Sequence, residues 1–169
     1  MSDTVTLEQA DAHTGALDTI FARVADEVDV DLERELRAVH RERRPRRPLK
    51  LSNESTTVRR FAVCDAGRVV GYVAGRFGGG IPGVSLPDDA VGAFVRLVLV
   101  DPSERGRELA GQAICAFAQE AYERGATHIG LRLDTTDPVE PRRRAFRRLG
   151  FDIEQPTPTL PISDLVTPG

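Results

Sequence analysis

The pattern of hydrophobic and polar positions is clearest in the second half of the chain, where it predicts two strands joined by a helix. Residues 93–100 are almost all aliphatic or β-branched and end at an Asp-Pro pair, which predicts a buried strand closed by a turn. Across residues 109–125 apolar positions recur every three or four residues up to a Gly, as in an amphipathic helix. Residues 127–134 alternate between apolar and polar or small side chains, which predicts a second strand. Because a helix connects the two strands, the second is expected to run parallel to the first.

The C-terminal part of the chain predicts one more helix and a short final strand. Residues 139–149 carry five arginines around an apolar face centred on Phe146. After residues 151–154, where we expect the next strand, the tail 156–169 contains four prolines. Prolines at this density exclude a central strand. The last strand is therefore short, at an edge, or replaced by an extended arm.

The N-terminal half predicts a strand, two helices and a hairpin. A short strand is expected at residues 4–8, and helical periodicity follows in residues 17–28 and 32–39. Residues 57–64 and 68–74 read as strands on either side of an Asp-Ala-Gly turn. With the strand that follows, they form an antiparallel meander.

Composition limits the class of protein. The chain has 169 residues, of which 40% are hydrophobic, and a net charge of −3, so it is expected to fold alone as one domain. Cys64 and Cys115 are expected to be buried, unpaired thiols, with Cys115 on the apolar side of its helix. Without a long apolar run or a signal-peptide pattern, we expect a cytoplasmic protein. No spacing of metal ligands stands out, so no metal is expected.

The segment between the first strand and the helix could bind phosphate. Residues 103–111 contain two glycines and two arginines directly before a helix N-terminus, which offers unpaired backbone N–H groups beside positive charge. The alternative is a turn that needs Gly106 only for its backbone angles. The pattern alone leaves both open.

Two motifs resemble the GNAT-type N-acetyltransferase superfamily. Residues 100–110, from Val-Asp-Pro to Arg-Gly-Arg-Glu-Leu-Ala, resemble its acyl-CoA-binding signature, R/Q-x-x-G-x-G/A, which follows a strand and a turn proline. Residues 141–151, which end in Leu-Gly-Phe, resemble its late helix and the exit into the next strand. Together the motifs cover about residues 57–155.

This resemblance implies a fold. It is an α/β fold with a mixed, mostly antiparallel twisted sheet, helices on both faces, and a splay between the two central parallel strands. A single domain would occupy residues 1–155, with a helical lid and basic loop in 1–48 and the sheet and acyl-CoA-binding core in 57–155. Residues 156–169 would form a Pro-rich tail.

The resemblance also implies an activity, the transfer of an acetyl group from acetyl-CoA, or of another acyl group from its CoA ester, to a primary amine of an unidentified small molecule or protein. The pantetheine arm would bond to backbone groups of the first strand, like an added strand. The pyrophosphate would bind at the following turn. The residues expected to face the cofactor are Val98, Leu99, Val100, Arg105, Gly106, Arg107, Leu109, Ala110 and Gly111.

Three positions depart from the family pattern. Glu108 replaces the first motif glycine, Phe146 stands where many members have a Tyr that protonates the departing thiolate, and the strand offers Arg96 in place of a carboxylate base. The catalytic residue is therefore left open, with His128, Asp134 and Tyr122 as candidates. Two alternatives remain: a ligand-binding or interaction module that retains the fold, and an enzyme of another reaction type acting on a CoA- or carrier-protein-bound substrate.

Two segments are candidate contact surfaces. The basic run Arg41–Arg47 has three interpretations. It is a solvated loop without a partner, a docking site for an acidic carrier protein, or a contact for CoA phosphates. Nucleic acid is disfavoured because the chain is acidic overall and lacks interleaved aromatic residues. The Gly-rich residues 78–89 are either a long connection without a functional role or a loop that closes over an acceptor. A homodimer is left open, and no membrane contact is expected.

Overall fold

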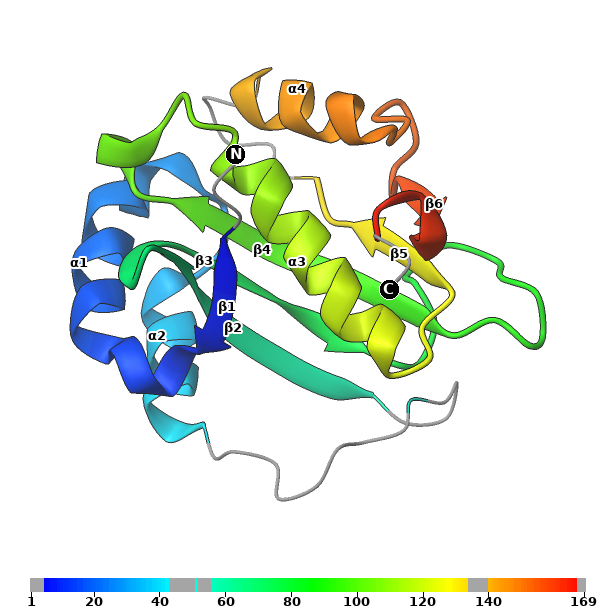
Figure 1. The fold of residues 1–169 in the computed structure, drawn as a ribbon, viewed down its shortest axis with the longest axis horizontal. Coiled ribbons are helices and arrows are strands. Elements are labelled where there is room, and N and C mark those ends of the chain that lie inside the picture. The colour runs from blue at the N-terminus through cyan, green and yellow to red at the C-terminus, as the bar shows by residue number, and fades with distance from the viewer. Residues whose placement is uncertain (1–4, 43–50, 52–55, 134–139, 167–169) are drawn as a thin grey trace.

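A six-stranded sheet forms the centre of the molecule (Figure 1). The computed structural model describes residues 5–42, 51, 56–133 and 140–166. The strands follow one another in chain order, and all neighbours are antiparallel except β4 and β5, which are parallel. The mixed, mostly antiparallel sheet predicted from the sequence is thus confirmed. The strands are β1 (Thr6–Gln9), β2 (Thr57–Asp65), β3 (Arg68–Phe77), β4 (Gly92–Val100), β5 (His128–Leu131) and β6 (Thr159–Pro161).

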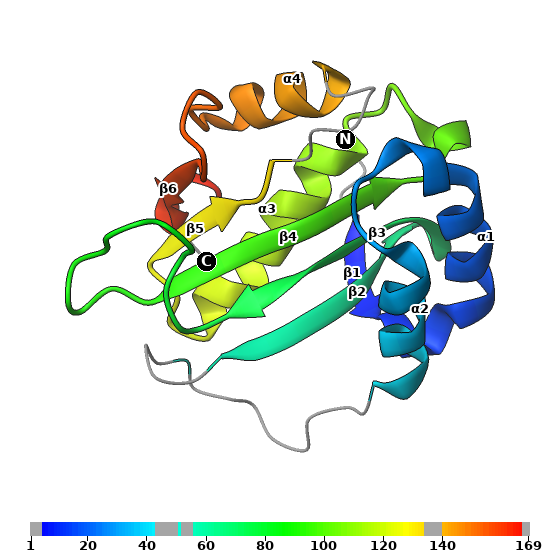
Figure 2. The same cartoon turned by 180° about the vertical axis from the view of Figure 1, so that it is seen from behind.

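Helices cover both faces of the sheet. The helix α3 (Leu109–Glu123) crosses the front face in Figure 1, and α4 (Glu140–Leu149) lies above it. The helices α1 (Thr14–Val24) and α2 (Leu32–Arg41) cover one end of the opposite face, seen in Figure 2. Short 3₁₀ helices are η1 (Ala10–His13), η2 (Ala25–Glu27), η3 (Pro102–Glu104) and η4 (Ile162–Asp164).

The sheet separates two hydrophobic cores. On the front face the apolar stripe of α3, including Ile114 and Phe117, is fully buried against the sheet. The rings of Phe77 and Phe117 meet edge to face with centroids 4.8 Å apart. On the back face Leu17 and Phe21 of α1 pack over the sheet around Tyr72. Because strand side chains alternate between faces, one set of strands serves both cores.

Local backbone geometry explains why the β2–β3 hairpin turns and why α3 ends where the sequence predicted. Asp65 pairs with Arg68, so the β2–β3 turn has only Ala66 and Gly67 at its centre, both with positive φ. That geometry matches the right-handed twist of a hairpin. At the end of α3, Gly125 has φ +102° and Ala126 donates its N–H to Ala121 O, which closes the helix.

Two sequence-based expectations are corrected. Residues 151–154 form no strand, and the last strand is β6 at the sheet edge, inside the Pro-rich tail. It fits there because only one side of an edge strand must bond to a neighbour, which tolerates prolines. Cys115 lies half-buried on the outer side of α3 because the inner side is filled by Ala113, Ile114 and Phe117.

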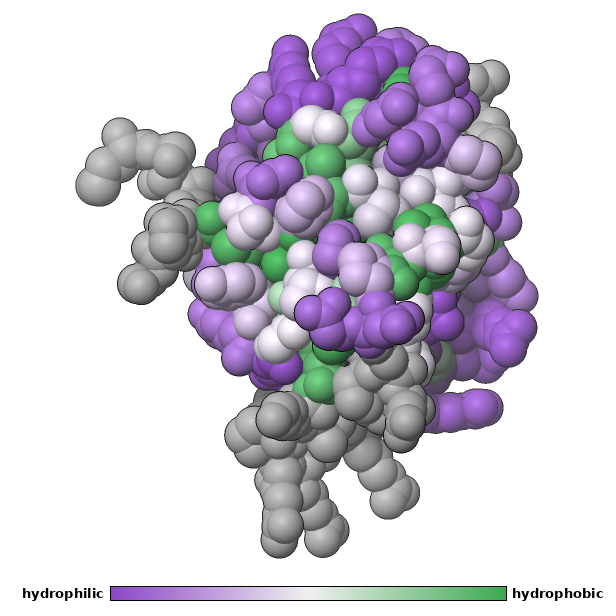
Figure 3. All heavy atoms as spheres, turned by 90° about the vertical axis from the view of Figure 1, so that its right-hand side faces the viewer, coloured by the Kyte–Doolittle hydropathy of each residue, from purple (hydrophilic) through white to green (hydrophobic). Residues whose placement is uncertain are grey.

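The Gly-rich connection before β4 is ordered and lies away from the second half of β4. Its ends are joined by hydrogen bonds from Gly78 N–H to Gly92 O and from Gly92 N–H to Gly79 O. Ile81 is buried against Gly92 and Gly130, at the start of the β4–β5 pair. Figure 3 shows this end of the molecule, where apolar and neutral groups gather between hydrophilic margins.

No helix among the described residues is long and apolar enough to span a membrane.

Candidate functional site

The parallel strands β4 and β5 separate halfway along β4. Their pairing ends at Val95 and Leu131, with a last bond of 2.9 Å from Arg132 N–H to Val95 O. The strand β4 continues to Val100, so its second half has no partner on this side among the described residues. The predicted splay is therefore present.

A β-bulge decides which backbone groups face the gap. On β3 the register passes from Ala74–Leu97 to Gly75–Val95, which leaves Arg96 as an extra residue of β4. Asp101 N–H bonds back to Val70 O of β3, and backbone direction alternates along a strand. The N–H and C=O groups of Val98 and Val100 therefore point into the gap, whereas those of Leu99 point to β3.

The gap is narrow in this structure. It holds two small cavities of about 80 and 20 Å³, and Val98, Arg142 and Phe146 line both of them. Phe146 is 6% exposed, so it belongs to the front core and also forms a wall of the gap. Such volumes are well below the roughly 300–1,000 Å³ of typical ligand sites, so a ligand must widen the gap.

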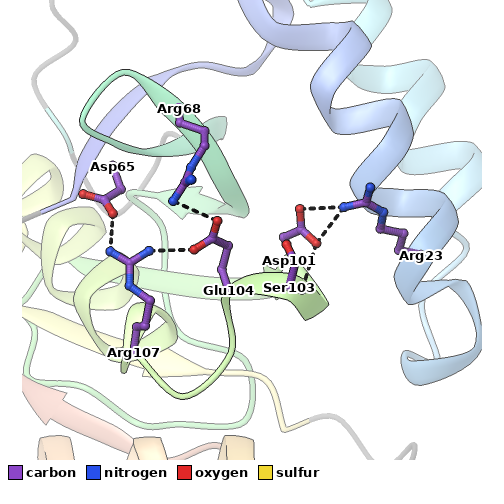
Figure 4. A network of polar contacts seen from close by, with 7 residues as sticks. All are labelled: Arg23, Asp65, Arg68, Asp101, Ser103, Glu104 and Arg107. Atoms are coloured by element: carbon purple, nitrogen blue, oxygen red, sulfur yellow. Dashed lines mark hydrogen bonds and ion pairs between the residues drawn. The ribbon is translucent and has the colours of Figure 1, made fainter.

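A polar network holds the turn that leads from β4 into α3 (Figure 4). Arg107 bonds to Asp65 and Glu104, and Arg68 bonds to Glu104 at 2.8 Å. These contacts attach the turn to the β2–β3 hairpin. The side chain of Arg107, predicted to face a cofactor, is engaged with these carboxylates in this structure.

The same network fixes the start of the turn through Asp101. Its carboxylate accepts the N–H of Ser103 and a guanidinium N–H of Arg23 on α1, the latter at 3.0 Å. Burial alone would raise the pKa of Asp101, but the bonds from Ser103 and Arg23 lower it below its usual value. The turn is thus tied to α1 and to the β2–β3 hairpin.

The N-terminus of α3 is open towards the gap. Its cap residue, Glu108, has φ +57° and makes no side-chain capping bond. The first N–H with an intrahelical partner is that of Gln112, which bonds to Glu108 O, so the groups of Leu109, Ala110 and Gly111 have none. Ala110 and Arg105 line the larger cavity of the gap. This combination suits an anion.

The Glu108 carboxylate does not point into this site. It pairs with Arg148 of α4, is 68% exposed, and lines a different groove on the outer side of α3. The negative charge that departs from the family pattern is therefore partly neutralised.

A contact that we call the latch, Glu27 with Arg105 and Arg142, closes the gap from the α1–α2 side. Arg105 donates to the Glu27 carboxylate at 2.7 Å, and Arg142 of α4 donates to Glu27 O at 3.2 Å. The hydrogen bond from Arg105 lowers the pKa of Glu27. The latch thus engages the side chain of Arg105, which is one of the residues that the family resemblance places beside the cofactor.

A buried carboxylate from α2 lies behind the bulge. Glu35 accepts two bonds of 2.8 Å from Arg96 and the hydroxyl proton of Tyr72, and Arg60 lies 3.4 Å away. Glu35 is 4% exposed. Burial and the neighbouring Glu35 charge raise the pKa of Tyr72, so the phenol stays protonated. The strand β4 carries Arg96 where the family pattern has a carboxylate, and the carboxylate that pairs with Arg96 comes from Glu35 of α2.

Two of the predicted catalytic candidates, His128 and Tyr122, do not line the gap. His128 starts β5, three residues or about 10 Å along the strand before the gap opens, and bonds to Thr127 Oγ1 at 2.8 Å. Tyr122 is exposed at the far end of α3, about 18 Å along the helix from Ala110. Asp134 lies outside the described residues.

Comparison with known sequences identifies the family. Residues 26–151 match the sequence model of the acetyltransferase (GNAT) family. The chain belongs to this family. The match spans the latch, the splayed strands and the open end of α3. None of the curated proteins compared with this sequence is similar to it.

Solved structures share the GNAT fold. A putative acetyltransferase of the GNAT family from Desulfovibrio desulfuricans superposes with a TM-score of 0.63 at 10% identity, covering 94% of this chain and 98% of that one. The aminoglycoside N-acetyltransferase AAC(6')-Iy, in complex with CoA, has a TM-score of 0.61 at 15% identity and covers 88% and 86%. A ribosomal-protein-alanine N-acetyltransferase from Brucella melitensis gives 0.56 at 16%, covering 83% and 85%.

Sequence reasoning missed Glu27 and Glu35. Glu27 gives no periodic signal, because its partners Arg105 and Arg142 come from distant parts of the chain. Glu35 did carry a signal: it stands three residues after Leu32 and four before Val39, on the stripe that the helix buries. A carboxylate on an apolar stripe predicts a buried cation partner.

Proposed function

We propose that this GNAT protein is an acyl-CoA-dependent N-acyltransferase that transfers an acyl group, acetyl in the simplest case, to a primary amine. The observation that carries the proposal is the pair of backbone groups at Val98 and Val100, directed into a gap that ends at the open N-terminus of α3. An extended amide chain fits such an edge as an added strand. A pyrophosphate fits the helix end.

The residues of the chain would bind and orient, while the CoA thioester supplies the activated acyl group. Val98 and Val100 would bond the pantetheine arm, and the N–H groups of Leu109, Ala110 and Gly111 would receive the pyrophosphate. Arg105 would add positive charge once released from Glu27. The described residues place no histidine in the gap, so rate acceleration would rest on positioning of the amine against the thioester.

Two acceptor classes agree with the family. The aminoglycoside and ribosomal-protein enzymes named above act, by their names, on a small molecule and on a protein. Either class remains a proposal for this chain. Docking of an acidic carrier protein at Arg41–Arg47 also stays a prediction, because residues 43–47 lie outside the described residues. The homodimer stays a prediction as well.

Calorimetric titration with acetyl-CoA and with free CoA tests the proposal. We expect micromolar binding by the wild type. Ala110→Glu should abolish it by placing an anion in the gap, whereas Gln119→Glu, which adds the same charge on the outer side of α3, should retain it. Retained affinity in Ala110→Glu would mean that the ligand binds elsewhere.

A second candidate function is a non-catalytic module that retains the fold. The closed latch and the small cavities favour it, because both leave no room for a cofactor in this conformation. Absence of binding to both CoA ligands in the titration would support this module.

Loosening the latch should strengthen CoA binding. Glu27→Gln removes the charge that holds Arg105, and a partly exposed ion pair contributes about 0.5–1 kcal/mol. We therefore expect affinity to rise about two- to fivefold in the same titration. The neighbouring Asp26→Asn removes a charge from the same 3₁₀ helix and is the control. Equal affinities in the two variants would show that the latch does not oppose binding.

Replacing Glu108 by glycine should leave stability nearly unchanged and tighten CoA binding. Glycine avoids the cost of about 1 kcal/mol that the positive φ imposes on Glu108. Two losses offset this gain in stability: glycine has greater conformational freedom in the unfolded chain, and the ion pair with Arg148 is removed. Removing an anion near the helix end should raise affinity about two- to fivefold at low salt. High salt should erase the gain. A gain that persists at high salt would rule out an electrostatic cause.

A further inference from the structure

The structure brings together three metal-ligating side chains outside the CoA gap. Glu8 lies on β1, His13 ends η1, and Cys64 lies on β2. One ligand atom of each lies within 4.8 Å of the other two. Because Cys64 comes from a segment far along the chain from Glu8 and His13, no ligand spacing in the sequence revealed the group.

The backbone explains why these three side chains converge. Thr6 pairs with Cys64 and Glu8 with Ala62, so Glu8 and Cys64 lie diagonally on the same face of the sheet. The register of β2 against β3 shifts between Val63 and Cys64, and this leaves Val70 as an extra residue of β3 beside Cys64. The tight turn of η1 then returns the chain, and His13 makes no helix-capping bond.

The distances are compatible with one tetrahedral ion. His13 Nε2 and Glu8 Oε1 are 3.2 Å apart. Bonds of about 2.0–2.2 Å from zinc to nitrogen and oxygen place two such atoms about 3.4 Å apart at the tetrahedral angle. With a zinc–sulfur bond of about 2.3 Å, the sulfur must lie about 3.6 Å from each. The separations within 4.8 Å therefore need to shorten by at most about 1.2 Å.

We propose that Glu8, His13 and Cys64 bind one divalent cation of the zinc class, with water as the fourth ligand. Sulfur and imidazole ligands select zinc, cobalt or cadmium over magnesium and calcium. On binding, the thiol proton leaves to the solvent and a metal–sulfur bond forms. The ion, one thiolate, one carboxylate and a neutral imidazole then sum to zero charge, which suits a half-buried position.

The site has an entry path and a mechanical role. The side chains of Glu8 and His13 are 49% and 23% exposed, whereas Cys64 is fully buried, so the ion enters from solvent with sulfur as its deepest ligand. Bound metal would attach the four-residue strand β1 and the turn η1 to β2. Occupancy therefore stabilises the N-terminal edge of the sheet.

Cobalt titration of the untagged full chain, after removal of metal with a chelator, tests the proposal. We expect a sulfur-to-cobalt charge-transfer band and the visible bands of tetrahedral cobalt, both removed by adding zinc. Cys64→Ser should lose the charge-transfer band. Cys115→Ser removes the other thiol, on α3, and should keep it. Absence of the band in the wild type, or its survival in Cys64→Ser, would overturn the site.

Two further variants keep the test decisive if Cys64→Ser fails to fold. Glu8→Gln changes an exposed side chain and should weaken cobalt binding at least about tenfold, with circular dichroism unchanged. His40→Asn is the control for His13→Asn, because His40 also pairs with a carboxylate, Asp18, at 3.3 Å. Unchanged affinity in both Glu8→Gln and His13→Asn would contradict the three-ligand site.

Thermal unfolding gives an independent readout. Zinc at a hundredfold excess over its Kd should raise the Tm of the wild type by roughly 5 °C or more, and magnesium should not. His13→Asn should lose this shift, and His40→Asn should keep it. An equal shift in both variants would place the ion elsewhere.

Discussion

Replacing Glu35 by alanine should lower the free energy of unfolding by about 3 kcal/mol. The change leaves Arg96 and Arg60 without their shared carboxylate and Tyr72 without an acceptor. Breaking a buried ion pair from one side costs about 3–5 kcal/mol. We expect the lower end of that range because Arg96 and Arg60 are 30% and 20% exposed and can be hydrated.

Urea denaturation measures this loss, and the same helix offers a matched control. Glu33 pairs with Arg37 but is 85% exposed, so Glu33→Ala should change stability by less than about 0.5 kcal/mol. Glu35→Gln keeps a hydrogen-bond acceptor and should fall between the two. Equal stabilities of Glu35→Ala and Glu33→Ala would show that the buried network does not stabilise the fold.

Gly75→Ala should destabilise the protein by about 2–3 kcal/mol and also weaken CoA binding. A Cβ at Gly75 would overlap the carbonyl oxygen of Phe94 on β4 and lie 2.9 Å from Cζ of Phe117. Neither atom can move freely, because one is backbone and the other is in the core. Gly75 pairs with Val95, next to the bulge at Arg96, so the distortion reaches the residues that shape the gap.

The control for this substitution is Gly80→Ala, where a Cβ would meet no atom within 4 Å. Its stability should stay within about 0.5 kcal/mol of the wild type. Denaturation and the CoA titration should be run on both variants. If Gly75→Ala loses stability but binds CoA normally, the bulge does not control the cofactor gap.

Most of the fold could be predicted where local pattern and tertiary environment agree. The helix α3 begins and ends where its periodicity and Gly125 indicated, and β4 matches the aliphatic run within one residue. The strand β6 was misplaced because three residues on an edge give no alternation to read. The side of Cys115 was wrong because small residues on α3 blur the boundary of its apolar stripe.

The candidate site was only half accessible to sequence reasoning. The turn at Arg105 was found because Gly, Arg and a helix start lie consecutively in the chain. The latch depends on which carboxylate folding brings to Arg105, and Glu27 lies 78 residues away. Likewise, the sequence shows that Arg96 stands where the family pattern has a carboxylate. That Glu35 pairs with Arg96 can be known only once α2 is seen to pack behind β4. Long-range charge pairing leaves no periodic trace.

The chain-order sheet has a consequence for synthesis on the ribosome. The back core draws all of its buried residues from the segment between Ala10 and Leu99, and the Glu35 network closes at Arg96. This half can consolidate while α3 is still being made. The front core needs α3 and continues to Ile162. The nascent chain would therefore complete its charged network first and form the gap between β4 and β5 last.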